Sequence, residues 1–179
     1  MKERTEKTLK EASLVFPIEG DVVWLGLKPV SESGEIKIGE GKRNGYGGGV
    51  ENGETILECA KRELEEESGL VVAVGDFEKR AELTFYKHKS TGEISRALVH
   101  VFVVRLSGIA DMIRATPEMG DPQSFPVHHL PNESLMRADR NWLPLVLAGK
   151  KIRATAHYTP QQKELIGEVE IEFVESFES

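Results

Sequence analysis

The sequence predicts one domain of the α+β class, with β-sheet strands and two or three helices. Three observations lead to this prediction. Short segments rich in β-branched and apolar residues recur along the chain, one long segment has helical composition, and 39% of residues are hydrophobic against 30% charged. A chain of 179 residues can bury a complete core without disulfides. Residues 1–12 are polar and are expected to form a lead-in to a single domain at residues 13–179.

Strands are expected where apolar runs alternate with turn signals. These runs are residues 13–18, 22–27, 71–74, 81–88, 97–106, 152–158 and 166–174. Residues 29–42 predict a loop with a short strand near Ile36, and residues 117–131 predict an acidic loop with another short strand. Ser90-Thr91-Gly92 predicts a hairpin turn, whereas residues 44–49 hold too many glycines for the interior of a regular element.

Two helices are expected. Residues 55–68 consist largely of residues that favour helix, and Gly69 follows at the position where a left-handed residue ends a helix. Residues 141–147 predict a second, shorter helix that ends before Gly149.

One stripe of the longer helix changes from apolar to acidic. With about 100° per residue, the stripe comprises Ile56, Cys59 and Ala60, followed by Glu63, Glu66 and Glu67. Like charges at this spacing repel, and the C-terminal end of a helix disfavours negative charge, so an ordinary solvated face does not explain the three carboxylates. A bound hard divalent cation does explain them, and Arg62 is placed one turn before Glu66 to orient its carboxylate.

The net charge of −7 constrains the partners. An acidic surface repels a phosphate backbone, which argues against a nucleic acid polymer. No apolar stretch reaches the ~20 residues of a membrane span. The charged N-terminus lacks the apolar core of a secretory signal, so we expect a cytoplasmic protein whose single cysteine, Cys59, stays reduced. A small phosphorylated ligand fits this charge only if a metal ion or local basic residues attract it.

Nine residues around the longer helix form a single motif. Gly48, Glu54, Arg62, Glu63, Leu64, Glu66, Glu67, Gly69 and Leu70 fill every specified position of G-x5-E-x7-R-E-U-x-E-E-x-G-U, where U is a bulky aliphatic residue. This motif looks like the Nudix box, so the chain resembles the Nudix hydrolases. The resemblance implies an α/β/α sandwich with a mixed β-sheet between helices and with the box as a loop–helix–loop. It also implies hydrolysis of a nucleoside diphosphate linked to another group, with Mg²⁺, or with Mn²⁺ as a substitute.

The same resemblance implies roles for individual residues. The expected catalytic set is Glu54, Arg62, Glu63, Glu66 and Glu67, with Glu54 stabilising the loop–helix–loop. The metal would be held by Glu63, Glu66, Glu67 and the carbonyl of Gly47.

A wider pattern is similar to the MutT-homologue enzymes, which hydrolyse oxidised purine nucleoside triphosphates to the monophosphate and pyrophosphate. The pattern comprises the box and residues 25–28, 41–48, 117–119 and 142–145. It implies that the nucleotide is bound by Ser13, Lys28, Asn44, Met136 and Asp139, and that Glu118 is a further metal-linked residue.

Three positions depart from that pattern. Met136 and Ala138 stand where the family reads the base with a tryptophan and the first of two aspartates. Arg43 replaces an aromatic residue. Stacking on an indole and one acidic contact are therefore lost, while Asp139 is retained.

The sequence supports one function best and leaves two alternatives. The first is a nucleoside triphosphate diphosphatase, with 8-oxo-dGTP as a candidate substrate and with the protein as a monomer or homodimer. The second is a hydrolase of a dinucleoside polyphosphate, ADP-ribose or a nucleotide sugar. Phe85 and Tyr86 lie where ADP-ribose enzymes often carry a proline, about fifteen residues past the box, which argues against ADP-ribose. The third is a non-catalytic nucleotide sensor, against which the intact box argues.

Overall fold

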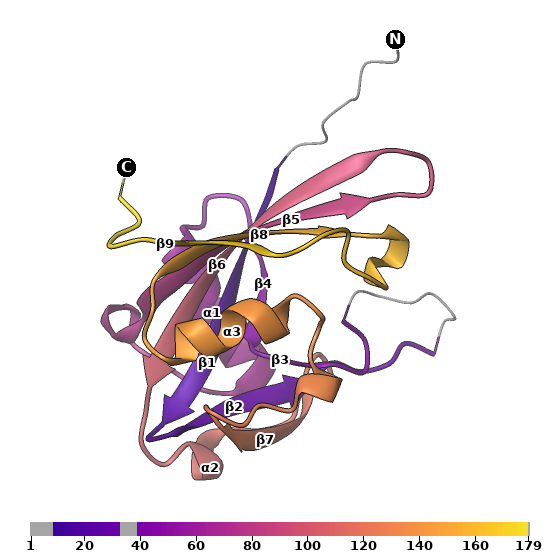
Figure 1. Cartoon of the computed structure of the whole chain (residues 1–179). Helices are drawn as coiled ribbons and strands as arrows, with labels where there is room; N and C mark the ends of the chain where they lie inside the picture. The colour runs from indigo at the N-terminus through magenta and orange to yellow at the C-terminus, as the bar shows by residue number, and fades with distance from the viewer. Residues whose placement is uncertain (1–8, 33–38, 179) are drawn as a thin grey trace.

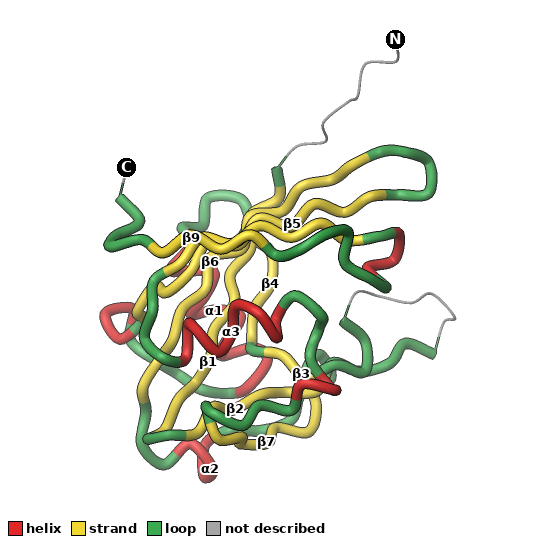
Figure 2. The backbone as a smooth tube through the Cα atoms, in the orientation of Figure 1, coloured by secondary structure: helices red, strands yellow, loops and turns green. Residues whose placement is uncertain are grey.

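The computed structural model describes residues 9–32 and 39–178 and is built around one mixed sheet (Figures 1 and 2). Its strands are β1 (Lys10–Glu19), β2 (Val22–Leu27), β3 (Arg43–Asn44), β4 (Tyr46–Gly49), β5 (Glu78–His88), β6 (Ile94–Arg105), β7 (Gly120–Pro126), β8 (Ile152–Tyr158) and β9 (Glu170–Phe173). The order along the sheet is β3-β2-β1-β6-β5-β8-β9, with β4 paired to β1 and β7 paired to β2. Because β1 and β6 run parallel, as do β5 and β8, while the hairpins are antiparallel, the predicted mixed sheet is confirmed.

Helices cover both faces of the sheet (Figure 1). The helical segments are α1 (Ile56–Ser68), α2 (Ile109–Met112), α3 (Asp139–Leu147) and the single 3₁₀ turns η1 (Val74–Asp76), η2 (Asn132–Ser134) and η3 (Pro160–Gln162). Side chains of β1 alternate between the two layers: Val15 packs in one cluster with Leu64 of α1, and Phe16 packs in another with Trp142 of α3. The α/β/α arrangement is therefore confirmed. Among the described residues, no helix is long and apolar enough to cross a membrane.

Several elements follow the sequence closely. The strands predicted at 22–27 and 152–158 have the observed bounds, and the turn at residues 90–92 joins β5 to β6 in the predicted hairpin. Helix α1 has Thr55 as its N-cap and ends at Gly69, which adopts a φ of 77°. Strand β1 begins three residues before the predicted start, and α3 begins two residues before its own. The expected strand within residues 117–131 is β7.

The strand predicted at residues 71–74 is wrong. Val72 is buried in the cluster beneath α1, but it pairs with no strand among the described residues. Its carbonyl instead accepts from Lys61 Nζ at 2.8 Å, and the chain continues directly into η1. The apolar run therefore anchors a loop. Of the strand predicted at 166–174, only Glu170–Phe173 forms, after the left-handed Gly167. The strand predicted near Ile36 lies outside the described residues.

The glycine run is also a correction, because residues 46–49 form strand β4. This strand pairs antiparallel with β1, and Leu14 lies opposite Gly47. A Cβ at Gly47 would lie 1.9 Å from the carbonyl oxygen of Ser13, so only glycine permits the two backbones to approach this closely. Glycine is disfavoured in strands in general, and here a close backbone contact overrides that preference.

Candidate active site

Helix α1 carries the predicted acidic stripe toward the sheet. The helix begins with a capping box, in which the Thr55 hydroxyl accepts from Glu58 N and the Glu58 carboxylate accepts from Thr55 N. Its apolar first half is buried through Cys59 and Ala60. In the second half Glu67 is buried and Glu63 is partly buried, whereas Glu66 is exposed.

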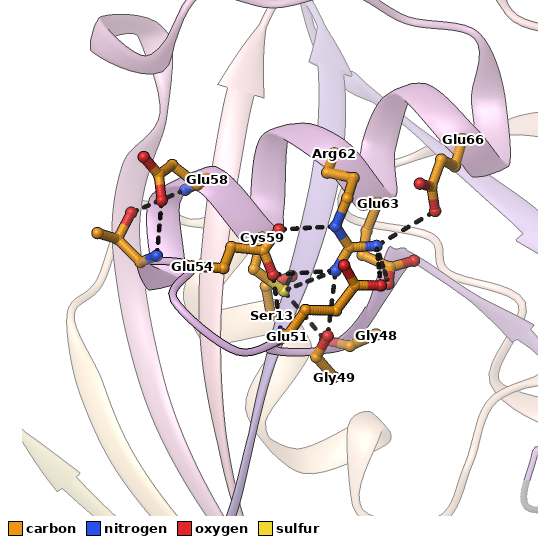
Figure 3. A network of polar contacts seen from close by, with 11 residues as sticks. Ser13, Gly48, Gly49, Glu51, Glu54, Glu58, Cys59, Arg62, Glu63 and Glu66 are labelled. Carbon is orange, nitrogen blue, oxygen red and sulfur yellow. Dashed lines mark hydrogen bonds and ion pairs between the residues drawn. The ribbon is translucent and has the colours of Figure 1, made fainter.

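Arg62 gathers the carboxylates of the motif (Figure 3). Its Nε donates to Glu54 Oε1 at 2.6 Å, and its Nη1 donates to Glu63 Oε1 at 2.9 Å and to Glu66 Oε2 at 3.2 Å. These pairs raise the pKa of Arg62, and its guanidinium is the main cause of the lowered pKa of Glu54. Glu54 also accepts from the backbone N–H of Glu51 at 2.9 Å, which connects the loop before the helix to the helix itself. The contact expected between Arg62 and Glu66 is present.

Glu67 lies apart from this network and faces β4. Its Oε1 accepts from Gly47 N at 2.8 Å, and only 5% of the residue is exposed. Burial is the main cause that raises the pKa of Glu67 to about 8. The hydrogen bond from Gly47 opposes that shift, while the charges of Glu63 and Glu118 add to it.

Three carboxylates converge at the end of this stripe: Glu63, Glu66 and Glu118. Each offers an oxygen, and these oxygens all lie within 4.8 Å of one another. Burial raises the pKa of Glu63, and the nearby charges of Glu66 and Glu118 raise it further. A set of carboxylate oxygens at this spacing has the donor chemistry that Mg²⁺ and Mn²⁺ prefer, so the residues present fit a hard divalent cation. The structure thus brings Glu118, predicted from outside the motif, to Glu63 and Glu66.

The glycines of β4 separate this acidic group from a cavity. On one side, a Cβ at Gly48 would lie 2.5 Å from Glu63 Oε1. On the other side, Gly47, Gly48 and Gly49 line a cavity of about 440 Å³. The three glycines of β4 therefore allow carboxylates on one face of the strand to lie next to a ligand on the other.

All five residues predicted to bind the nucleotide line that cavity: Ser13, Lys28, Asn44, Met136 and Asp139. They come from β1, the residue after β2, β3, the loop before α3 and the first residue of α3, which are far apart in sequence. The wall also contains residues that the sequence did not single out as pocket residues, namely Lys10, Glu11, Ala12, Leu14, Phe85, Lys87, Ala97, Val99, Trp142, Tyr158 and Gln162. The alternation of side chains along β5 predicts that Phe85 and Lys87 share one face of the strand. It does not predict which helix covers that face.

Two of the predicted residues use their side chains within the protein. The Ser13 hydroxyl lies 3.3 Å from Cys59 Sγ, on the side of β1 that faces α1 (Figure 3). Cys59 is completely buried, as the apolar stripe predicted, and burial raises the pKa of its thiol. The Asn44 side-chain oxygen accepts from Gly45 N at 2.8 Å. The side chain of Ser13 is therefore turned toward the helix, although the residue borders the cavity.

The start of α3 contributes a buried carboxyl group. Trp142 Nε1 donates to Asp139 Oδ1 at 3.0 Å, and burial raises the pKa of Asp139 to about 7. Next to it, the backbone N–H of Ala138 donates to the Tyr158 hydroxyl at 3.0 Å. With Met136 on the same wall, this end of the cavity combines apolar and aromatic surface with a single carboxyl group.

Arg43 connects β3, which carries Asn44, to Asp121 of β7, the strand that follows Glu118. Its Nη2 lies 2.5 Å from Asp121 Oδ2, and its Nη1 donates to the Asp121 carbonyl. Arg43 is buried, and its guanidinium carbon lies 5.7 Å from the centre of the Phe125 ring. Asp121 is exposed and has a φ of 40°, a conformation that costs a non-glycine residue about 1 kcal/mol or more. Its ion pair with Arg43 helps to offset that strain, three residues beyond Glu118.

Comparison with known proteins agrees with this geometry. The family model described as the NUDIX domain matches residues 30–146. The fold is similar to that of a mutator MutT protein from Bacillus halodurans, with a TM-score of 0.71 and 23% identity over 91% of this chain and 97% of that one. A MutT protein from Methanosarcina mazei gives a TM-score of 0.63 and 16% identity over 80% of this chain and 96% of that one.

Sequence relatives extend over nearly the whole chain. A Mus musculus protein named oxidized purine nucleoside triphosphate hydrolase is 33% identical over 168 residues, which cover 92% of this chain and 96% of the relative. A Danio rerio protein of the same name is 33% identical over 171 residues, which cover 94% and 97%. The family model spans more than half of the chain and includes α1, the glycine strand and Glu118. The chain therefore belongs to the Nudix hydrolase family.

Proposed function

We propose that the protein hydrolyses an oxidised purine nucleoside triphosphate, such as 8-oxo-dGTP, to the nucleoside monophosphate and pyrophosphate with Mg²⁺, for which Mn²⁺ can substitute. The observation that carries the proposal is the placement of the acidic group of Glu63, Glu66 and Glu118 next to a 440 Å³ cavity, with β4 between them. The names of the two 33% identical relatives support the choice of base.

The walls of the cavity suit the two ends of a nucleotide. Phe85, Met136 and Trp142 offer flat and apolar surface for a base. Lys28 lines the cavity and is close enough to Glu67 to lower its pKa, so its positive charge lies where phosphates would approach the carboxylates. A small nucleotide is favoured over a nucleic acid polymer because the net charge is −7.

The protein's own groups then set up hydrolysis of a phosphoanhydride. Arg62 fixes the orientation of Glu63 and Glu66 through its hydrogen bonds. A divalent cation at the acidic group would neutralise phosphoryl charge and align a water molecule. Glu67 can hold a proton near neutral pH because burial raises its pKa to about 8. Cytoplasmic location and a monomeric or dimeric state stay predictions of the sequence.

The test is pyrophosphate release by Glu67→Gln with Mg²⁺ present. Glutamine keeps an oxygen for the Gly47 N–H but removes the titratable carboxyl group, so we expect the fold to persist and turnover to fall at least about 100-fold. The control is Glu65→Gln on the exposed side of the same helix, which should retain wild-type turnover.

The substrate panel should contain canonical and oxidised dNTPs, nucleotide sugars, ADP-ribose and dinucleoside polyphosphates. Release of pyrophosphate and a monophosphate from an oxidised dNTP supports the proposal. Release of AMP and ribose phosphate from ADP-ribose as the preferred reaction contradicts it. Tight nucleotide binding without any turnover would instead support the sensor alternative.

A further inference from the structure

Lys87 is a lysine inside the cavity that the proposed function does not use. Phe85 lies two residues before Lys87 on the same face of β5, and both side chains line the cavity. Within residues 9–32 and 39–178, no carboxylate forms an ion pair with Lys87. Its neighbour on the same hairpin differs, since Lys89 Nζ lies 3.1 Å from Glu93 Oε2.

The side chain of Lys87 is partly buried and lines the cavity. A lysine that only covers apolar surface extends its ammonium into bulk water. Burial is instead the main cause that lowers the pKa of Lys87, and the positive charges of Lys10 and Lys28 lower it further. A partly buried cation whose neighbours are also cations is unfavourable unless a ligand supplies an electronegative partner.

Lys87 lies at the end of the cavity away from the acidic group. Across the sheet, Gly47 pairs with Leu14, Leu14 with Val101, and Val101 with Ala81. Lys87 lies six residues beyond Ala81 along β5, which corresponds to about 20 Å at 3.3 Å per residue. There it pairs with Tyr158, whose ring lies 6.1 Å from that of Phe85.

These positions fix which part of a nucleotide Lys87 would meet. With phosphates at the acidic group, the base occupies the end that holds Phe85, Met136 and Tyr158. On this wall Asp139 accepts a hydrogen bond from Trp142, while Lys87 of β5 adds a donor. Lys87 therefore lies beside the apolar and aromatic surfaces that would hold the ring system.

We propose that Lys87 is a specificity-determining residue that donates a hydrogen bond to an oxygen that oxidation adds to the purine ring. This inference rests on the proposed function, because that function places the base in the cavity. The chemistry recognised is a carbonyl or anionic oxygen on the base, absent from the parent purine.

The experiment measures binding of deoxynucleoside monophosphates without metal, so that hydrolysis plays no part. Isothermal calorimetry compares 8-oxo-dGMP with dGMP and 8-oxo-dAMP with dAMP, because each pair differs at the oxidised position. We expect wild-type protein to prefer the oxidised member of at least one pair, and Lys87→Met to reduce that preference about 10- to 100-fold. Methionine matches the length of the lysine stem without its charge, and unfolding curves show whether the fold persists.

Two further variants make the result specific. Lys89→Met removes a lysine from the same hairpin outside this cavity and should leave the preference unchanged. Lys87→Arg keeps a charged donor and should retain most of the preference.

If Lys87→Met weakened the binding of both nucleotides of each pair equally, the inference would be overturned, because the lysine would then contact phosphate or sugar. An unchanged preference, or a wild-type protein that binds both members equally, would overturn it as well. Loss of wild-type hydrolysis with the binding preference intact would contradict only the proposed function.

Discussion

At the scale of single residues, Asp139 shows how burial controls one carboxyl group. The residue is 5% exposed and accepts one hydrogen bond from Trp142, and burial raises its pKa to about 7. In the unfolded chain the same group titrates near 3.8. The folded protein therefore binds this proton more tightly than the unfolded chain does.

The sign of the pH dependence follows from that difference. Stability contributed by protonated Asp139 is fully present below about pH 3.8 and is lost as the pH rises through about 7. As the pH rises, Asp139 should lower the free energy of unfolding of the wild-type protein by at most a few kcal/mol. Asp139→Asn keeps an oxygen for Trp142 and should remove this decline. Urea denaturation of metal-free protein at about pH 5 and about pH 8 measures it. Parallel pH dependence in both proteins would show that Asp139 is not the source.

At the scale of elements, β4 determines how close the helix and the cavity can be. Gly48 faces Glu63, whereas a Cβ at Gly49 would meet nothing within 4 Å, and neither residue has a positive φ. The two adjacent glycines thus differ in space but not in backbone strain.

Gly48→Ala should displace the Glu63 carboxylate, since the added carbon would lie 2.5 Å from its Oε1. We expect turnover to fall at least about tenfold, as for other disturbed metal-ligand environments. Gly49→Ala is the matched control and should keep wild-type turnover and stability. Initial rates with an oxidised dNTP, together with thermal unfolding, distinguish a local effect from misfolding. Equal activity of the two variants would be incompatible with contact between Gly48 and Glu63.

The elements also show what a sequence can and cannot predict. Helix α1 was predictable because its cap, stripe and terminal glycine are local signals, and the acidic stripe pointed to the same helix as the motif. Strand β4 was not, because its glycines are tolerated only through a backbone contact with Ser13, which is distant in sequence. Residues 71–74 have strand composition, yet whether a strand forms depends on an available neighbour.

The candidate site divides in the same way. Glu63, Glu66 and Glu67 could be predicted from helical periodicity, and Glu118 from resemblance. Lys87 could not, since its significance depends on which charges surround it after folding. The turn of the Ser13 hydroxyl toward Cys59 likewise follows from the register of β1 and not from its own identity.

At the scale of the whole molecule, the clustered carboxylates should make stability depend on divalent cations. A ligand that binds only the folded state stabilises it by about 2.7 kcal/mol at one hundred times its Kd. For a chain of this size we therefore expect Mg²⁺ or Mn²⁺ at that excess to raise Tm by about 5–10 °C. Calorimetric melts with and without the metal, reversed by a chelator, measure the effect.

Glu63→Gln should abolish most of the rise in Tm, while Glu65→Gln should retain it, because Glu63 belongs to the converging carboxylates and Glu65 does not. A Tm that does not respond to either metal in wild-type protein would argue against a cation at this group.

The ion pair between Arg43 and Asp121 couples the segment that carries Asn44 at the cavity to the segment that carries Glu118 at the acidic group. One guanidinium restrains the backbone next to Asn44 and the backbone three residues after Glu118. Binding that orders one of these segments lowers the entropic cost of ordering the other. Nucleotide and cation should consequently bind with positive cooperativity. This cooperativity depends on the buried side chain of Arg43, which neither of them touches.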